Sequence, residues 1–302
     1  MTSQIVTPID PFAAHVHGGY SDALVEVHAV GPQLPRRELR TVRTTHFDVA
    51  RVAGRIRVRH SLAASQIDDD LGGLLADELF GPGWLRGPDL FERLFTGVVR
   101  SVADDPREAW GHFYRNSLLR IEECLTTATI GSGSHGTISG YAPVYQHAES
   151  LLVDGSSLEL GCCFGFLSLR IAAAGRRVMS SDVSAGTVRL LATMAPLLGV
   201  ELSTVPADAA RFPAVADYAD NVLVIHLLEH LDQAHGARVL TEALRLARRR
   251  VVVAVPLERE ADETWGHVRP VSLDDLDAWG RSTGLAYDVH EHHGGWLVIE
   301  SR

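Results

Sequence analysis

The second half of the chain contains a motif whose glycines and carboxylate suggest a ligand-binding turn. In Leu158-Glu-Leu-Gly-Cys-Cys-Phe-Gly165, an apolar segment meets an acid, and Gly161 and Gly165 then carry the chain into an apolar helical pattern. Glycines are needed where the backbone turns sharply and a ligand approaches it closely. The motif predicts a strand, a tight turn and a helix beside a bound ligand.

Two aspartates follow at the ends of later apolar segments. Asp182 ends Val178-Met-Ser-Ser-Asp182, 17 residues after Gly165, and Asp208 lies in Pro206-Ala-Asp-Ala-Ala-Arg-Phe-Pro213. A carboxylate at a strand end can accept hydrogen bonds from both ribose hydroxyls of a nucleoside. Either aspartate alone could equally be a helix cap. The two together, at this spacing, favour a nucleoside site.

Histidines and a glutamate follow the apolar segment 221–225. His226-Leu-Leu-Glu-His230 matches the HxxEH pattern of inverted zinc proteases. Its place among the nucleoside motifs argues against a protease. His230, His226 and the more distant His267 are candidates for a general base or for orienting a substrate. Structural hydrogen bonding by neutral histidine and a carboxylate is the alternative, and the sequence leaves it open.

The elements that must position these residues alternate between strand and helix. Strands are expected at 157–160, 177–181, 203–206, 221–225 and 250–255, with helices at 165–174, 185–198 and 233–247. This alternation favours a parallel sheet covered on both faces. The tail adds two strands, 285–290 and 296–301, joined by a hairpin at Gly294-Gly295.

The first half has a different pattern. Its first forty residues, with His15 and His17, show little periodicity. Segments 41–50 and 55–60 predict a hairpin that turns at Ala53-Gly54. Helical patterns follow at 68–80, 88–103 and 106–127, and the apolar stripe of the last is expected in a core. That stripe consists of Trp110, Phe113, Tyr114, Leu118, Ile121 and Leu125.

A glycine-rich segment, 130–141, is expected to form a boundary between the two halves. Within it, 131–136 reads GxGxxG but follows a helical pattern rather than a strand, so a phosphate site is not expected. Gly140 and Pro143 are expected to interrupt any helix there. A linker or a lid is the preferred interpretation.

In their order and spacing, the motifs resemble those of class I S-adenosylmethionine-dependent methyltransferases. The first resembles acid-x-Gly-x-Gly-x-Gly and departs from it at Cys163, where the family has its middle glycine. The resemblance covers about residues 141–302. It implies an α/β fold with a Rossmann-like, mostly parallel sheet and an antiparallel last strand. It also implies that residues 1–130 form an N-terminal α+β extension on the acceptor or lid side, and residues 131–302 the cofactor-binding domain.

The same resemblance implies the cofactor and its contacts. In the family, the second acid binds the ribose, and an Asp-Ala pair, here Asp208 and Ala209, holds the adenine. The residues expected to bind S-adenosyl-L-methionine are Glu159, Gly161, Cys162, Gly165, Asp182, Val183, Asp208, Ala209 and His226. Because the cofactor is already activated, the cysteines are not expected to act as nucleophiles.

Catalysis is expected from His230 and His267, with Glu229 and His226 nearby. Some methyltransferases that act on vicinal hydroxyls have ExxEH at this position and bind a divalent metal. This chain has His226 in place of the first glutamate. Whether a metal binds at His226, Glu229 and His230, with His267 as a further candidate ligand, is therefore left open. Trp265, His267 and Arg269 would suit a sugar, as a stacking surface, a base and a hydrogen-bond fork.

Composition limits the partners. The net charge is -10, which argues against nucleic acid, and the longest apolar runs are too short to span a bilayer. The three cysteines form no disulfide framework, and the first residues form no secretion signal. We therefore expect a cytoplasmic protein with a small-molecule or saccharide acceptor, no membrane partner, and homo-oligomers as an option.

A finer resemblance lies in the first half. Thr45-His-Phe-Asp-Val-Ala-Arg-Val52 and Gly54-Arg-Ile-Arg-Val-Arg-His60 resemble the actinobacterial mycofactocin oligosaccharide methyltransferases. That resemblance implies O-methylation of a glucose unit. All 28 basic residues are arginine, which suits such a genome. The alternative from another class is a non-catalytic binding or scaffold protein with this fold, suggested by Cys163.

Overall fold

The computed structural model describes residues 9–13, 19–31, 33–34, 41–127, 136–262 and 265–301. The chain divides into two compact units, Met1–Ser139 and Gly140–Arg302. The boundary expected after residue 130, most of the GxGxxG segment, His15 and His17 lie outside the described residues. Among the described helices, none is both long and apolar enough to cross a membrane.

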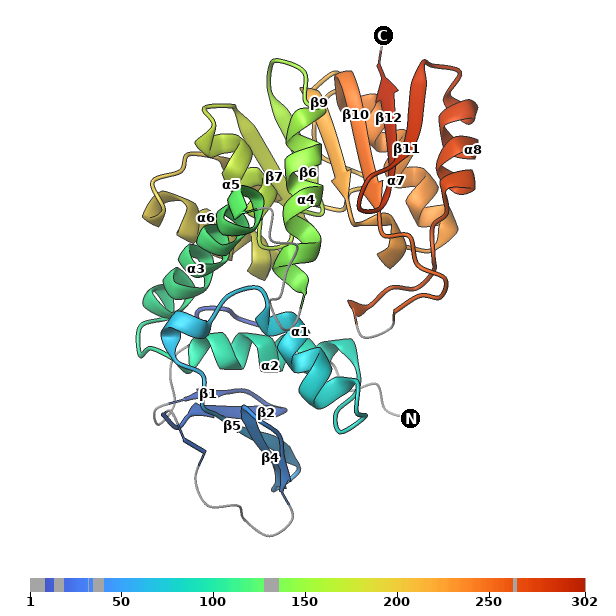
Figure 1. Ribbon diagram of the computed structural model, residues 1–302. Helices are drawn as coiled ribbons and strands as arrows, with labels where there is room; N and C mark the ends of the chain where they lie inside the picture. The colour runs from blue at the N-terminus through green and yellow to red at the C-terminus, as the bar shows by residue number, and fades with distance from the viewer. Residues whose placement is uncertain are drawn as a thin grey trace. The chain divides into compact units, whose positions relative to one another are not determined.

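The C-terminal unit is built on a seven-stranded sheet (Figure 1). Its strands are β6 (Ser157–Leu160), β7 (Val178–Asp182), β8 (Ser203–Pro206), β9 (Ala219–Ile225), β10 (Ala247–Val255), β11 (Tyr287–Glu291) and β12 (Gly295–Glu300). Their spatial order is β11-β12-β10-β9-β6-β7-β8. Strands β6 to β10 pair in parallel, whereas β12 runs antiparallel to both β10 and β11. The predicted fold class is confirmed.

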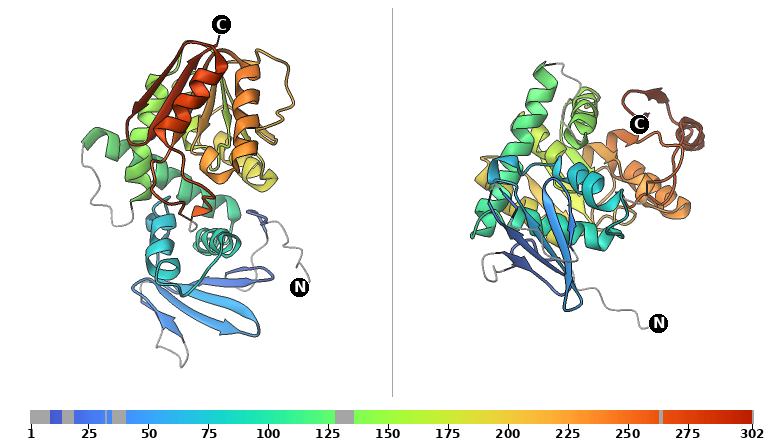
Figure 2. Two further views of the ribbon diagram at one scale, coloured as in Figure 1. Left: turned by 90° about the vertical axis from the view of Figure 1, so that its right-hand side faces the viewer. Right: turned by 60° about the horizontal axis from the view of Figure 1, so that its bottom comes forward.

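Helices cover both faces of this sheet (Figure 2). They are α4 (Thr137–Ser150), α5 (Phe166–Ala173), α6 (Ala185–Leu197), α7 (Gln233–Leu246) and α8 (Leu273–Thr283). Val144 of α4 and Leu167 of α5 belong to one core cluster. Val239 of α7 and Leu276 of α8 belong to the other. Because both faces are buried, the carboxyl-terminal parts of β9 and β10, residues 222–225 and 251–255, are apolar at every position rather than alternating.

Helix α4 corrects one prediction. Gly140 and Pro143 lie inside it, although we expected them to interrupt a helix here. An interior proline removes a backbone donor and costs about 3 kcal/mol. Val144 and Ala148 are fully buried against the sheet. Tertiary packing of this face therefore outweighs the local preference.

The N-terminal unit contains a five-stranded sheet. Its strands are β1 (Tyr20–Ser21), β2 (Val25–Ala29), β3 (Val42–Arg43), β4 (Phe47–Val52) and β5 (Arg55–His60), in the order β1-β2-β5-β4-β3. The predicted hairpin is confirmed, since β4 and β5 are antiparallel and joined by two residues. Ala53 and Gly54 have φ of 49° and 84°, as a type I′ turn requires. Strands β1 and β2 were not predicted.

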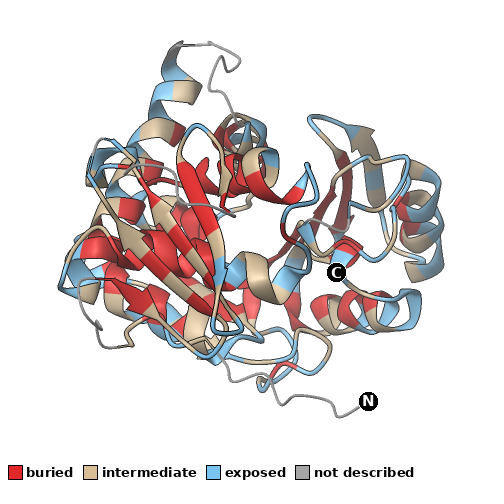
Figure 3. Ribbon diagram, turned by 90° about the horizontal axis from the view of Figure 1, so that it is seen from below, coloured by how far each residue is buried: buried red, intermediate tan, exposed pale blue. Residues whose placement is uncertain are grey.

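The N-terminal unit also contains helices. They are η1 (Ala64–Gln66), α1 (Leu71–Leu75), η2 (Ala76–Phe80), α2 (Pro88–Arg100) and α3 (Pro106–Thr127). On α3, Trp110, Phe113, Tyr114 and Ile121 are buried, which confirms the expected core stripe for these four residues. The other two, Leu118 and Leu125, are only partly buried. Strand β5 alternates between buried and partly buried residues, and Figure 3 shows this alternation on the strands of the sheet.

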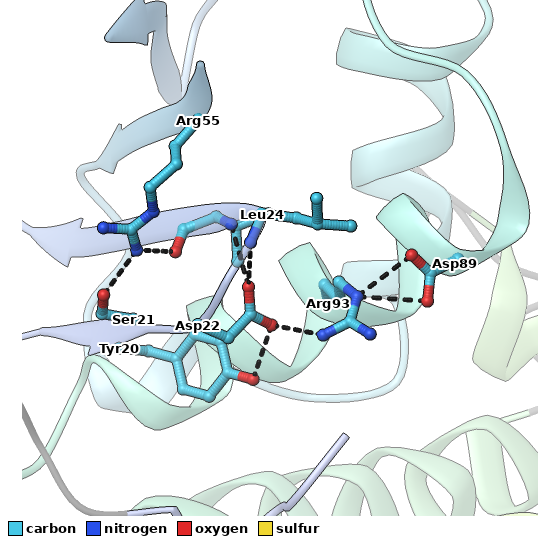
Figure 4. Close-up of polar contacts among 8 residues, drawn as sticks. Tyr20, Ser21, Asp22, Leu24, Arg55, Asp89 and Arg93 are labelled. Atoms are coloured by element: carbon cyan, nitrogen blue, oxygen red, sulfur yellow. Dashed lines mark hydrogen bonds and ion pairs between the residues drawn. The ribbon is translucent and has the colours of Figure 1, made fainter. Parts of the chain in front are cut away.

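A polar network joins α2 to the first strands (Figure 4). The Arg93 guanidinium is only 3% exposed and binds Asp22 and Asp89. Burial alone would raise the pKa of Asp22, but the amides of Val25 and Leu24 and the Arg93 charge outweigh it and lower that pKa. A buried charge needs such partners. The network therefore fixes α2 against the strand ends.

Candidate functional site

The predicted motifs meet at the carboxyl edge of the seven-stranded sheet. The turn 161–165 follows β6, Asp182 ends β7, and His226 follows β9. These strands are parallel neighbours, so their carboxyl ends lie at one edge. In open α/β sheets, ligands bind outside this edge.

The turn after β6 needs its glycines for two separate reasons. Gly161 and Gly165 have φ of 76° and 75°. A Cβ added at Gly161 would lie 2.9 Å from Leu227 Cδ1, and one at Gly165 would lie 2.5 Å from Leu191 Cδ2. Cys163 also has a left-handed φ, 47°, although it bears a side chain. The backbone thus keeps a conformation that glycine favours, at the position where the family motif has glycine.

Asp182 is held by backbone amides from two segments. Its carboxylate accepts from the Cys163 amide at 3.1 Å and from the Ser184 amide at 2.9 Å. The next residue, Val183, is 79% exposed. A fixed carboxylate beside an exposed apolar side chain can serve the hydroxyls of a ribose and the face of a nucleobase.

The motif's other acid turns inward. Glu159 is buried and accepts from Ser168 Oγ of α5, which accepts in turn from Ser180 Oγ at 2.6 Å. Burial raises the pKa of Glu159 to about 7. Burial likewise raises the pKa of the Cys162 thiol. The side chains of Glu159 and Cys162 are thus both buried beneath the turn.

Asp208 and Ala209 follow β8 and lie close to Asp182 along the backbone. The Ala207 amide donates to the Asp182 carbonyl at 3.0 Å. Asp208 Oδ1 accepts from the Ala210 amide at 2.9 Å and lies 3.1 Å from His235 Nε2. The Ala210 amide and His235 lower the pKa of Asp208. Sequence reasoning missed His235, which lies in the first turn of α7.

A buried carboxyl group lies in the segment that follows β9, near the carboxyl edge of the sheet. Glu229, in the short helix η3 (Leu228–His230), is 1% exposed, and neither of its carboxyl oxygens has a hydrogen-bond partner among the described residues. His226 Nδ1 is 3.8 Å away, too far for a hydrogen bond. Burial raises the pKa of Glu229 to about 8 and lowers that of His226 to about 4. Both groups are therefore mainly neutral at pH 7, and this contact is not an ion pair.

His230 and His267 form a pair beside Glu229. Their ring centroids are 4.9 Å apart at 84°. His230 Nδ1 lies 3.3 Å from the Gly266 carbonyl, and His267 Nδ1 lies 2.8 Å from Glu258 Oε2. Burial and His267 lower the pKa of His230. Glu229, His230 and His267 offer ligand atoms within 4.8 Å of one another, so the three could hold a metal ion.

Neighbours of this cluster include two residues that the sequence did not indicate. Glu258 follows β10, and Tyr141 of α4 places its ring 5.0 Å from the His226 ring. Trp265 is partly exposed. Arg269 donates from Nε to the Leu231 carbonyl and lies 5.5 Å over Trp279. The structure thus gives Arg269 a packing role in addition to any contact with a ligand.

The family match among known proteins lies in the C-terminal unit. Residues 158–250 match a family described as a methyltransferase domain. Similar solved structures include YcgJ from Bacillus subtilis, at 18% identity and a TM-score of 0.42 over 48% of this chain and 71% of that one. Magnesium protoporphyrin IX methyltransferase from Synechocystis PCC 6803 with bound SAM has 16% identity and a TM-score of 0.47, over 61% and 96%.

A SAM-dependent methyltransferase from Methanosarcina mazei is also similar, at 16% identity and a TM-score of 0.45 over 52% of this chain and 96% of that one. The search among curated proteins gave no significant match.

Proposed function

We propose that this chain, which contains an S-adenosylmethionine-dependent methyltransferase domain, methylates a hydroxyl of a saccharide or another small molecule. The proposal depends most on one observation. His230, His267 and Glu229 cluster at the same sheet edge as the glycine turn and Asp182. Methyl transfer from a sulfonium requires in-line alignment, and a hydroxyl acceptor must also lose its proton.

Cofactor binding in this proposal uses the turn and the two aspartates. Asp182 accepts hydrogen bonds from the ribose hydroxyls, and Asp208 with the Ala209 amide holds the adenine. The turn, with Gly161 and Cys162, lies along the rest of the cofactor. Supporting observations are the left-handed glycines, the fixed Asp182 carboxylate and the exposed Val183.

Hydroxyl activation is assigned to the histidine pair. The His230 side chain is exposed enough to reach an acceptor, and its lowered pKa keeps the imidazole neutral. The Glu258 carboxylate lies 2.8 Å from His267 Nδ1 and orients this ring beside His230. A neutral imidazole at a cofactor edge is suited to removing or orienting a hydroxyl proton.

For the acceptor, we propose a glucose unit of the mycofactocin oligosaccharide, with residues 1–130 as the acceptor-side extension. The support is the sequence of the β4–β5 hairpin and the exposed part of Trp265, on which a sugar ring could stack. The net charge of -10 favours a neutral saccharide over nucleic acid.

The test combines turnover with cofactor binding. Mass spectrometry would follow methyl transfer to a glucoside by the wild type, His267→Ala and Trp265→Ala, and calorimetry would measure S-adenosylmethionine affinity. Loss of a general base should reduce turnover by about 10²–10⁴-fold, while cofactor affinity is unchanged. His292→Ala, an exposed histidine on the terminal hairpin, is the control and should react normally. Normal turnover by both site variants would show that the acceptor binds elsewhere.

A further inference from the structure

The cluster of Glu229, His230 and His267 has the composition of a metal site. It offers one carboxylate and two imidazoles, with all three ligand atoms within 4.8 Å of one another. Metal–ligand bonds of about 2.0–2.2 Å hold the ligand atoms of a single Zn²⁺ ion closer to one another than 4.8 Å. Small side-chain rotations would bring them to that spacing. We propose that these three residues bind one divalent metal ion of the type that prefers mixed nitrogen and oxygen ligands, such as Zn²⁺ or Mn²⁺.

Burial of Glu229 is the strongest support. The residue is 1% exposed, and neither carboxyl oxygen has a hydrogen-bond partner among the described residues. A buried polar group without a partner is costly and rare, so it needs an explanation. In a merely structural cluster, one of the nearby imidazoles would donate to it, yet His226 Nδ1 stays at 3.8 Å. A bound cation would supply the missing partner for both oxygens.

Each of the two histidines has an oxygen partner close to Nδ1. Glu258 fixes His267 through Nδ1 at 2.8 Å, and the Gly266 carbonyl lies 3.3 Å from His230 Nδ1. When Nδ1 donates to an oxygen, Nε2 is left with a free lone pair. Metal-binding histidines almost always have such a second partner, and a carboxylate is a common one. The pattern Glu258–His267–metal fits this rule.

Three protein ligands would leave coordination positions open, as in catalytic metal sites. This part of the inference rests on the proposed function. With the ion bound, the two histidines would act as its ligands rather than as bases. Two adjacent hydroxyl oxygens of an acceptor could occupy the open positions, and the ion, in place of a free imidazole, would make a bound hydroxyl more acidic. The acceptor class is therefore a saccharide or another molecule with vicinal hydroxyls.

Metal binding can be measured on the full chain without any turnover. Calorimetry with Zn²⁺ and Mn²⁺, and the visible spectrum of added Co²⁺, should show one site per wild-type chain. Glu229→Gln keeps the shape of the side chain and should abolish that site. Glu258→Gln, which alters only the orienting partner, should weaken it by about 10–100-fold. His290→Ala, in a separate histidine group on β11, is the control and should bind like the wild type.

Absence of binding to the wild type, or equal binding by folded Glu229→Gln, would overturn the proposal. Circular dichroism of each variant establishes that it is folded, and Glu258→Gln provides a second test if Glu229→Gln fails to fold. S-adenosylmethionine affinity, measured on the same samples, separates the two claims. Metal binding without cofactor binding would refute the proposed function alone. Cofactor binding without metal binding would refute this inference alone. Metal binding with chelator-resistant methylation of a vicinal diol would refute the role of the ion in activating the hydroxyl.

Discussion

Glu159, beneath the turn, shows how burial sets the protonation state of a carboxyl group. Glu159 lies inside the fold, where its carboxyl group accepts from Ser168 and is far from solvent. Its pKa is about 7 in the folded chain, against an ordinary value of 4.5, and burial is the main cause. Between these two values the folded chain binds more protons than the unfolded chain. Stability should therefore fall as pH rises through this window and level off above it.

Glu159→Gln should remove this dependence on pH. Integrated over the window from 4.5 to about 7, the wild type loses on the order of 3 kcal/mol of unfolding free energy through this group. The glutamine keeps an acceptor for Ser168 and does not titrate. Urea unfolding at pH 5 and pH 8 would measure the difference. If the variant and the wild type show the same change between these pH values, the buried carboxyl is not the source.

The sequence indicated some site residues better than others. Asp182 and the turn glycines could be predicted because each occupies a fixed place in a strand-turn-helix pattern. Glu258, His235 and Tyr141 could not, because their contacts come from separate elements and follow no local spacing. The unpartnered state of Glu229 is a property of packing, which HxxEH alone does not reveal.

Among the elements, helix α5 shows how a tight turn limits substitution. The helix begins after Gly165, whose left-handed conformation and lack of a side chain both matter. Gly175, after the end of the same helix, has a similar φ of 82° but no atom near its missing Cβ within 4 Å. A comparison of substitutions at these two glycines therefore separates the effect of backbone strain from that of steric crowding.

Alanine at each position should destabilise the fold to a different extent. Gly175→Ala should cost about 1–2 kcal/mol, the price of a left-handed L-residue. Gly165→Ala carries the same strain and also places a Cβ 2.5 Å from Leu191, which should add about 1–3 kcal/mol. Chemical unfolding of both variants gives the comparison. Equal losses would mean that Leu191 moves aside without cost, contrary to this account of the turn.

Contacts between elements that lie far apart in the sequence were harder to predict than the boundaries of the elements themselves. No local pattern indicates a contact for the histidines of the terminal hairpin. His147 Nε2 of α4 nevertheless lies 2.7 Å from His290 Nε2 of β11, and the His147 ring lies 4.2 Å from the ring of His292. Helix α4 itself was missed because Gly140 and Pro143 dominate its local pattern. Both failures arise because tertiary packing, rather than local preference, decides the structure there.

For the molecule as a whole, the alternation of strands and helices was sufficient to predict the fold class of the C-terminal unit. Strand segments bounded by glycines and helices of ordinary length leave few arrangements for a parallel sheet. The N-terminal sheet was predicted only in part. The β4–β5 hairpin has clear alternation and turn residues, whereas β1 is two residues long and β2 pairs with β5 across a long stretch of sequence.

The central claim is that the carboxyl edge of the seven-stranded sheet binds S-adenosylmethionine through Asp182. Calorimetric titration of the cofactor into the wild type and Asp182→Ala tests it most directly, with circular dichroism as the folding control. We predict one cofactor-binding site per wild-type chain. In the variant, the binding free energy should weaken by about 1.5–3 kcal/mol, which corresponds to an increase in Kd of roughly tenfold to a hundredfold. A wild type that does not bind the cofactor, or a folded variant that binds it equally well, would contradict the claim.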